Sequence, residues 1–276
     1  MNINVVKRAL RYIFRGIPVK TVKVDIYQVQ YNGLLKGKKI VITGGGHGIG
    51  RNIVEKCLAE GAEILIVGSN EDKLRKTAYE LGGISYIAYD LEDVNNLDRL
   101  YSQIIDVLGR IDCLVCNAGI SLHEGNLLKV THEQFEKQIR INLESVYFLT
   151  QITIKNRVDK QQLINIICIS SERGFQCDDL PYGLSKAALN SFVKGVTRRF
   201  YRENVRINGI APGVTTSDLT KKTNEDDLLL ERVVSGRYFL GEEIAEVTCF
   251  LLSDATKCIS GEVIACDAGE YISSYI

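Results

Sequence analysis

A glycine-rich turn between a short apolar strand and an amphipathic helix is the feature that most constrains the fold of this chain. Residues 40–42 read Ile-Val-Ile, a β-branched run typical of a buried parallel strand, and a helical pattern continues to Leu58. Between them stands the segment Thr43-Gly44-Gly45-Gly46-His47-Gly48-Ile49-Gly50. Glycines in such a turn let the backbone approach a pyrophosphate, which the free N–H groups at the helix N-terminus can bind. Because this turn joins a strand to a helix, a nucleotide-binding unit is favoured over a turn without a ligand.

Strand-like runs alternate with helical stretches along the rest of the chain. The runs span residues 40–43, 64–67, 84–89, 111–117, 163–169, 205–210 and 262–266. This alternation predicts an α/β fold: a doubly wound parallel sheet, or Rossmann fold, in a single domain. Ligands of such folds bind beyond the carboxyl ends of the strands. The glycine turn, Asn117, Ser171 and Pro212 all fall at those ends.

Tyr182 and Lys186 form the clearest candidate for chemistry. On a helix they lie one turn apart on the same face. A lysine ammonium near a phenol favours the phenolate and is expected to lower the tyrosine pKa. The hydroxyls of Ser170 and Ser171, just upstream, are candidates to polarise a carbonyl or alcohol oxygen. Taken alone, the pair is a weak signal, and an amphipathic helix with a core tyrosine and a solvated lysine is favoured over a catalytic pair.

The order of these motifs resembles that of the short-chain dehydrogenase/reductase family, and in particular its 3-oxoacyl reductases. The spacing of Gly44, Gly48 and Gly50 is similar to the family's T-G-x-x-x-G-x-G motif. The other matching positions are Asn117-Ala118-Gly119, Asn142, Ser171, Tyr182 with Lys186, Pro212-Gly213 and the last strand, residues 259–267. The resemblance runs from about Leu35 to the C-terminus.

This resemblance implies hydride transfer between NAD(P)(H) and a ketone or secondary alcohol, with reduction slightly favoured. Tyr182 would be the general acid in reduction and the base in oxidation, and Ser171 would bind the substrate oxygen. Lys186 would lower the tyrosine pKa and bind the nicotinamide ribose, while Asn142 would hold a water. A 3-oxoacyl thioester and a sugar or polyol are two candidate substrates. The alternative from another class is a catalytically silent nucleotide-binding regulator or scaffold, against which the intact four residues argue.

The resemblance also implies the cofactor contacts. They are Thr43, Gly44, Gly46, His47, Gly48, Ile49, Gly50, Ser69, Asn70, Asp90, Leu91, Asn117, Ala118, Gly119, Tyr182, Lys186, Pro212, Gly213, Val214 and Ser217. NAD-preferring relatives usually carry an acid where this chain has Gly68, so repulsion of a 2′-phosphate is absent. The arginine that NADP-preferring relatives often have at the Ser69 position is absent too. Arg51 is close in sequence, although a helix residue after Gly50 can point away. We expect NADP(H) to be favoured over NAD(H).

Composition narrows the classes of function that remain possible. The chain carries 34 basic and 34 acidic residues, a balance that argues against nucleic acid as a main partner. Of its eight cysteines, Cys113 and Cys116 have metal-like spacing, but on a strand they point to opposite faces. No second pair of possible ligands accompanies these two cysteines. The three histidines, His47, His123 and His132, also lack the spacing of metal ligands, and we therefore predict no metal site. His123 is expected in an exposed loop. Reduced, core-filling cysteines and the lack of a visible signal peptide indicate a cytoplasmic protein.

Residues 1–34 form a predicted extension to a domain of residues 35–276. Its apolar residues Val6, Leu10, Ile13 and Ile17 share one helical face, and Lys7, Arg8, Arg11 and Arg15 lie opposite. Residues 21–31 then alternate like a strand. The helix is too short to span a bilayer. It can lie on an anionic membrane surface or pack on a neighbouring domain or subunit, and packing is favoured.

Two further expectations concern contacts. Relatives commonly form dimers or tetramers through the helices bearing Asn142 and Tyr182, so we expect a homo-oligomer, with a tetramer first. These helices also carry apolar residues at helical spacing, which suit burial against the sheet or against a partner: Val146, Leu149, Ile152, Leu189, Phe192 and Val196. Arg173 either meets an anionic substrate group or pairs at the surface with Glu172 or Asp178, and the surface pair is favoured.

Overall fold

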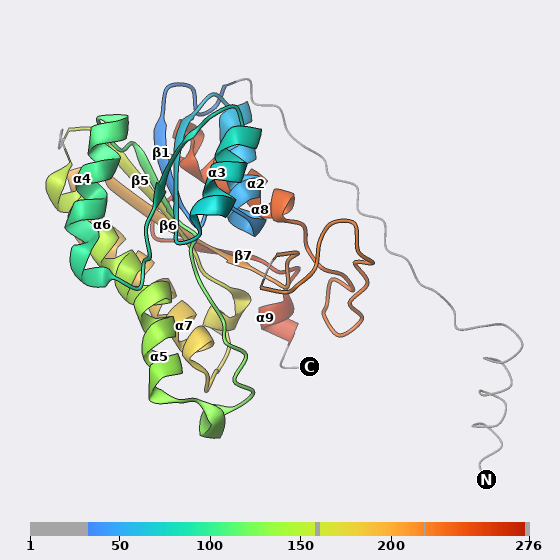
Figure 1. Cartoon of the computed structure of the whole chain (residues 1–276). Helices are drawn as coiled ribbons and strands as arrows, with labels where there is room; N and C mark the ends of the chain where they lie inside the picture. The colour runs from blue at the N-terminus through green and yellow to red at the C-terminus, as the bar shows by residue number, and fades with distance from the viewer. Residues whose placement is uncertain (1–32, 158–160, 218, 274–276) are drawn as a thin grey trace, which may run out of the picture.

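The computed structural model describes residues 33–157, 161–217 and 219–273. Its centre is a parallel sheet of seven strands in the order β3-β2-β1-β4-β5-β6-β7 (Figure 1). The strands are β1 (Lys39–Thr43), β2 (Glu63–Gly68), β3 (Ser85–Ala88), β4 (Cys113–Cys116), β5 (Ile164–Ile169), β6 (Val205–Pro212) and β7 (Val263–Cys266). All seven predicted strands are present, and the doubly wound single domain is confirmed. The strand order reverses direction next to β1, between β1 and β4, where such sheets form their ligand crevice.

Helices cover both faces of the sheet (Figure 1). One face carries α2 (Gly48–Ala59), α3 (Glu71–Glu80) and α8 (Gly241–Leu252), and the other α4 (Leu97–Leu108), α6 (Ser145–Asn156) and α7 (Pro181–Phe200). Side chains alternate along each strand, so Ile40 and Ile42 pack with the first group while Val41 packs with the second. The continuous apolar strands that the sequence shows are what a sheet buried on both faces requires.

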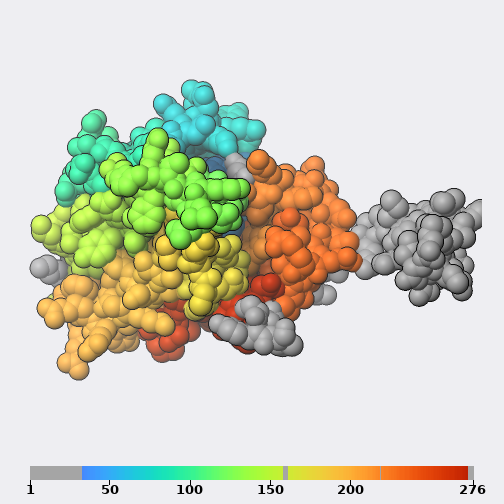
Figure 2. All heavy atoms as spheres, turned by 90° about the horizontal axis from the view of Figure 1, so that it is seen from below, coloured from blue at the N-terminus to red at the C-terminus, as the bar shows by residue number. Residues whose placement is uncertain are grey.

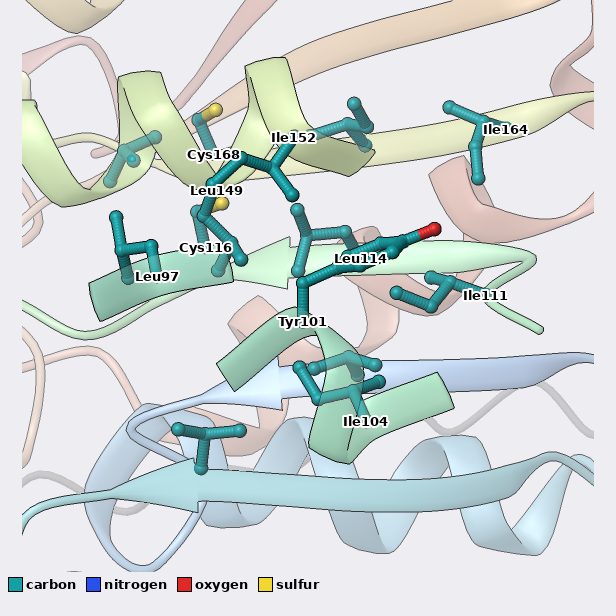
Figure 3. Close-up of a cluster of buried hydrophobic side chains, with 14 of the residues drawn as sticks. Leu97, Tyr101, Ile104, Ile111, Leu114, Cys116, Leu149, Ile152, Ile164 and Cys168 are labelled. Atoms are coloured by element: carbon teal, nitrogen blue, oxygen red, sulfur yellow. The ribbon is translucent and has the colours of Figure 1, made fainter. Parts of the chain in front are cut away.

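The core between β4, β5, α4 and α6 is drawn in Figure 3. Leu97, Tyr101 and Ile104 come from α4 and meet the buried side chains of β4 and β5. The Tyr101 hydroxyl donates to the Asn156 carbonyl oxygen at 2.9 Å, so burying this phenol leaves no unpaired donor. Cys116 belongs to this cluster and Cys113 to the cluster on the opposite face, which confirms the predicted divergence of the two thiols.

The apolar positions on these two helices, which suit burial against either the sheet or a partner subunit, lie largely in the chain's own core. Val146, Leu149, Leu189 and Val196 are each 8 % exposed or less. Phe192 is partly buried against the same cluster. The outer side of these helices presents other residues: Tyr147, Phe148 and Leu184, with exposed fractions of 45 %, 37 % and 45 %. An interface on α6 and α7 would therefore use that outer set.

Long loops gather at the carboxyl edge of the sheet. The segment between β6 and α8 is the longest, and its ends are tied by a bridge between Thr215 and Phe239. Figure 2 views the molecule from this end, with that segment in orange beside the green and yellow segments that carry α5 (His132–Ile139) and the start of α7. The short helix α9 (Glu270–Ser273) follows β7 at the same edge.

The predicted N-terminal extension is not covered by the residues that the structure describes. The predicted helix and strand-like arm lie in residues 1–32, outside the described part of the chain. Within the described part, no helix is both long enough and apolar enough to cross a membrane.

Candidate active site

The turn after β1 is built around backbone contacts that only glycine permits. A Cβ on Gly50 would lie 2.1 Å from the Gly44 carbonyl oxygen, and one on Gly44 would lie 2.8 Å from Asn117 Nδ2. Gly44 also has a φ of +67°, which L side chains rarely adopt. A side chain at Gly50 would force the first turn of α2 away from the glycine turn, and one at Gly44 would collide with the turn after β4.

Asn117 and Thr43 tie the turn after β4 to the turn after β1. Asn117 Nδ2 donates to the carbonyl oxygens of Thr43 at 3.0 Å and Gly44 at 3.1 Å. In return, Thr43 Oγ1 accepts from the backbone N–H groups of Asn117 and Ala118, each at 3.1 Å. Thr77 from α3 adds a contact that sequence reasoning missed, since its hydroxyl donates to the Gly46 carbonyl oxygen at 2.9 Å. A threonine in the middle of a helix carries no signal of that role.

The N-terminus of α2 fits a phosphate group. No side chain caps it at His47, and its first turn contains no acidic residue. By contrast α3, the next helix, is capped by Asn70 and begins with Glu71 and Asp72. Uncapped N–H groups at a helix N-terminus favour an anion. The glycine turn and this helix end together suit the pyrophosphate of a dinucleotide.

The position predicted for the adenosine half lies at the ends of β2 and β3. Gly68 ends β2, while Ser69, Asn70 and Asp90 are exposed. Asn70 Oδ1 accepts from the Lys73 N–H at 2.9 Å, so its side chain is used as a helix cap. Arg51 is engaged in two ion pairs, with Glu55 at 2.9 Å and Glu80 at 2.7 Å. These pairs occupy the guanidinium that sequence analysis considered for a 2′-phosphate.

Lys186 and Asn142 lie together beside Gly119. Asn142 is fully buried in a π-helical turn (Arg140–Glu144), and its amide bonds both the N–H and the carbonyl oxygen of Ile120 at 2.8 Å. Lys186 is 3 % exposed, and its Nζ donates to the Ile169 carbonyl oxygen at 2.9 Å. A Cβ on Gly119 would lie 3.4 Å from both Lys186 Nζ and Asn142 Oδ1. The turn after β4, the π-helical turn and α7 thus converge.

Ser171 lies on the other side of Tyr182. It follows the end of β5 and caps the short helix η4 (Glu172–Phe175), accepting from the Arg173 N–H at 3.2 Å. Its hydroxyl donates to Glu172 Oε2 at 2.9 Å, and it also acts on the Tyr182 phenol, whose pKa it lowers against the effect of burial. Gly174 lets η4 lie against α7, because a Cβ there would be 2.9 Å from the Lys186 backbone. All four predicted catalytic residues are therefore gathered at the carboxyl edge of β4 and β5.

Burial changes the pKa values of both Tyr182 and Lys186. In the protein chain alone, burial raises the pKa of Tyr182 to about 12, although a lowered value was predicted from its spacing to Lys186. Burial likewise lowers the pKa of Lys186 to about 8. The lysine Nζ is 5.6 Å from the centre of the tyrosine ring. The loss of hydration opposes charge on both groups. A lowered tyrosine pKa therefore stays a prediction for the enzyme with its oxidised cofactor bound.

Arg173 is held by Asp178, as the favoured interpretation expected. Its Nε donates to Asp178 Oδ2 at 2.7 Å, and the Asp178 side chain is 2 % exposed. Asp178 Oδ1 also accepts from the Leu180 N–H at 3.0 Å, at the start of α7. A Cβ on Gly183 would lie 1.8 Å from Asp178 Oδ2. The residue after Tyr182 must therefore be small, a requirement that the sequence alone did not reveal.

The segment predicted to face the carboxamide follows β6. Pro212 and Gly213 are buried, and a Cβ on Gly213 would lie 3.0 Å from the Asp267 Cα. Val214 and Ser217 are partly exposed. The Ser217 hydroxyl lies 3.4 Å from both the Thr215 carbonyl oxygen and Thr220 Oγ1.

Outside this region, His123 is exposed as expected, with a φ of +53°. The cysteines Cys57, Cys113, Cys116, Cys168 and Cys249 are buried and unbridged. In the described ranges there is no group of three or more His, Cys, Asp or Glu residues that could hold a metal ion.

The chain is similar to known reductases and to a sugar dehydrogenase over most of its length. The profile of the family described as enoyl-(acyl carrier protein) reductase matches residues 44–270. A 3-oxoacyl-(acyl-carrier-protein) reductase of Aquifex aeolicus is 30 % identical over 246 residues, which cover 86 % of this chain and 98 % of the relative. An L-rhamnose 1-dehydrogenase (NADP(+)) of Thermoplasma acidophilum is 31 % identical over 249 residues, 86 % of this chain and 98 % of that protein.

Among solved structures, a 3-ketoacyl-(acyl-carrier-protein) reductase of Brucella melitensis complexed with NADH superposes with a TM-score of 0.78. The match covers 86 % of this chain and 99 % of that one, at 24 % identity. At this level of identity the likeness establishes the fold.

Proposed function

The chain belongs to the short-chain dehydrogenase/reductase family and is an NAD(P)-dependent oxidoreductase acting on ketone or secondary alcohol groups, and from this premise we propose that it reduces a 3-oxoacyl thioester with NADPH. The observation that carries the chemistry is the convergence of Asn142, Ser171, Tyr182 and Lys186 at one edge of the sheet. The substrate class is supported by the relatives named as 3-oxoacyl reductases. The catalytically silent interpretation is left without support.

The residues present suit a nicotinamide cofactor. Gly44, Gly50 and the uncapped N-terminus of α2 would hold its pyrophosphate, and Asp90 its adenine. Lys186 would bind the nicotinamide ribose. When bound, the reduced nicotinamide supplies the hydride.

The chain's own residues manage the proton. Tyr182, protonated because burial raises its pKa, is the general acid that donates to the carbonyl oxygen. Ser171 binds the same oxygen and so aligns it with the phenol. Asn142 fixes the turn at Ile120 beside Lys186, where a water can return a proton to the site.

A substrate panel tests this proposal. Acetoacetyl-coenzyme A, a soluble 3-oxoacyl thioester, should be reduced with loss of the absorbance of reduced nicotinamide, and L-rhamnose should be a poor substrate for the reverse reaction. The Tyr182→Phe variant is the control for background oxidation. Rapid oxidation of L-rhamnose with no reduction of the thioester would contradict the proposed substrate and favour the sugar dehydrogenase.

We propose NADPH as the preferred cofactor because Gly68 places no acid against a 2′-phosphate. Gly68→Asp should reverse the preference towards NADH by repelling that phosphate. A Cβ at this position would lie 3.4 Å from Leu74 Cδ2, an ordinary contact, so the variant should fold. Fluorescence titration of both cofactors measures the effect, and Gly68→Ala is the matched control without charge. A wild-type preference for NADH of about tenfold, equivalent to about 1.4 kcal/mol, would contradict the assignment.

We also propose a cytoplasmic homo-oligomer, a tetramer or a dimer, in which residues 1–34 form an extension to the domain of residues 35–276. Eight unbridged cysteines suit a reducing compartment. Deleting residues 1–31 should lower thermal stability or change the assembly state on light scattering. Unchanged assembly and melting, with lost binding to anionic vesicles, would support the membrane-surface interpretation instead.

A further inference from the structure

The hydroxyl of Ser171 already has its hydrogen-bonding capacity in use. It lies 2.9 Å from Glu172 Oε2, accepts from the Arg173 N–H at 3.2 Å and contacts the Tyr182 phenol. A hydroxyl has one proton and two lone pairs. If Glu172 is an ionised carboxylate it can only accept, so the single proton of Ser171 is committed to it. The serine then has no proton with which to bind a substrate oxygen.

A protonated Glu172 reverses this hydrogen bond. A neutral carboxyl can donate its O–H to one lone pair of Ser171 Oγ, while the Arg173 N–H occupies the other. The proton of Ser171 is then free to point at the substrate. The 2.9 Å separation suits either direction.

The surroundings of Glu172 favour the neutral form. Burial raises its pKa, and Asp267, in the turn after β7, adds a second negative charge nearby. The hydrogen bonds that the carboxyl accepts from Ser171 and from the Glu172 backbone N–H, and the positive charge of Arg173 on the same short helix, act in the opposite direction. Arg173 is itself paired with Asp178, and Tyr182 faces Glu172 from α7. The electrostatic neighbours of Glu172 thus include the acid Asp267, the Tyr182 phenol and one arginine that is already paired with Asp178.

We propose that Glu172 is a positioning residue whose protonated form turns the Ser171 hydroxyl towards the substrate oxygen. The proposal rests on the proposed function, because it assumes that Ser171 binds a carbonyl oxygen during reduction. Protons balance without a further reactant: Glu172 takes its proton from solvent and keeps it, and Tyr182 supplies the proton that the substrate oxygen receives.

A pH dependence of the wild-type enzyme follows. Below the pKa of Glu172 the serine donates to the substrate, and above it the serine donates to the carboxylate. The kcat for reduction of acetoacetyl-coenzyme A should therefore fall as pH rises through that pKa, by about 100-fold, as for the loss of one donor to a reacting oxygen. Cofactor affinity should not change, since Glu172 does not contact the glycine turn.

Glu172→Gln is the decisive variant. Its amide keeps the size of the side chain, can donate to Ser171 Oγ and cannot ionise. The fall of kcat with rising pH that we assign to Glu172 should be absent from this variant. The kcat of the variant at the acidic end of the pH range should stay within about threefold of wild type, a smaller change than the loss of one hydrogen-bond donor would cause. Glu133→Gln, at an exposed position on α5, is the matched control and should keep the wild-type profile.

An infrared measurement without substrate gives an independent result. The difference spectrum of wild type minus Glu172→Gln should contain the band of a protonated carboxyl. This band should disappear as pH rises, with the same midpoint pH as the fall of kcat in wild type. A Glu172 carboxyl that titrates like an exposed glutamate would overturn the role of Glu172. The same fall of kcat with rising pH in an active Glu172→Gln enzyme would also overturn it. Failure of the wild type to reduce any ketone of the panel would instead overturn the proposed function itself.

Discussion

Single residues in this site have protonation properties set mainly by burial. Tyr182 is predicted to titrate near 12 in the chain alone, well above the ordinary value of 10.0. The tyrosinate absorbance of wild type minus Tyr182→Phe, recorded without cofactor, should therefore appear near pH 12. A difference titration near pH 7 would show that Lys186 alone is sufficient to lower the pKa.

The Tyr182→Phe variant should also lose about 1000-fold in kcat, within the range for loss of a general acid, and keep its cofactor affinity.

Lys186 should reduce the stability of the protein while serving its activity. Its pKa falls from 10.5 to about 8 because burial penalises the ammonium. Between these two values the unfolded chain binds more protons, so wild-type stability should rise with pH across that window, and the cost is fully present below pH 8. Lys186→Met should therefore raise the free energy of unfolding at pH 7 by about 2 kcal/mol, after loss of the hydrogen bond to Ile169, and abolish turnover.

Urea denaturation at several pH values measures this effect. Lys194→Met, at an exposed position on the same helix, is the control and should leave stability nearly unchanged. A Lys186→Met variant less stable than wild type at pH 7 would contradict the prediction.

At the scale of elements, the start of α7 is fitted to Asp178. Gly183→Ala should lower the free energy of unfolding by about 2 kcal/mol, as overpacking usually does, because its Cβ would meet a carboxylate held by Arg173 and Leu180. In an Asp178→Ala background the same change should be neutral or stabilising by up to about 1 kcal/mol, since alanine is the better helix former. Urea denaturation of the two single variants and the double variant measures the coupling. Additive effects would show that the clash is relieved elsewhere.

At the scale of the whole molecule, the outer side of α6 and α7 is the surface we expect to join subunits. Tyr147 is 45 % exposed, and its ring lies 5.2 Å from those of Phe148 and Phe192. Tyr147→Glu should yield a smaller species in sizing with light scattering, because the charge would be buried without a partner. Tyr79→Glu, on α3 and 84 % exposed, is the control. An unchanged mass with Tyr147→Glu would place the interface elsewhere.

The sequence by itself determined the fold and indicated where the candidate site lies. Apolar β-branched runs such as residues 40–42 need burial on both faces, which a parallel sheet between helices provides. Gly44 and Gly50 marked the turn because their role depends on the absence of a side chain, a property of the residue itself. Tyr182 and Lys186 could be paired because their spacing on one helix is local information.

Only the tertiary structure decided the properties that depend on neighbours distant in the sequence or on the direction of a hydrogen bond. The pKa values of Tyr182 and Lys186 follow from the burial of the whole site, which no local spacing reveals. Val146 and Leu189 turned out to face the chain's own core, because helix periodicity identifies an apolar side but not what covers it. The bond between Ser171 and Glu172 joins adjacent residues, yet its consequence depends on Asp267, from the turn after β7, and on Tyr182, from α7.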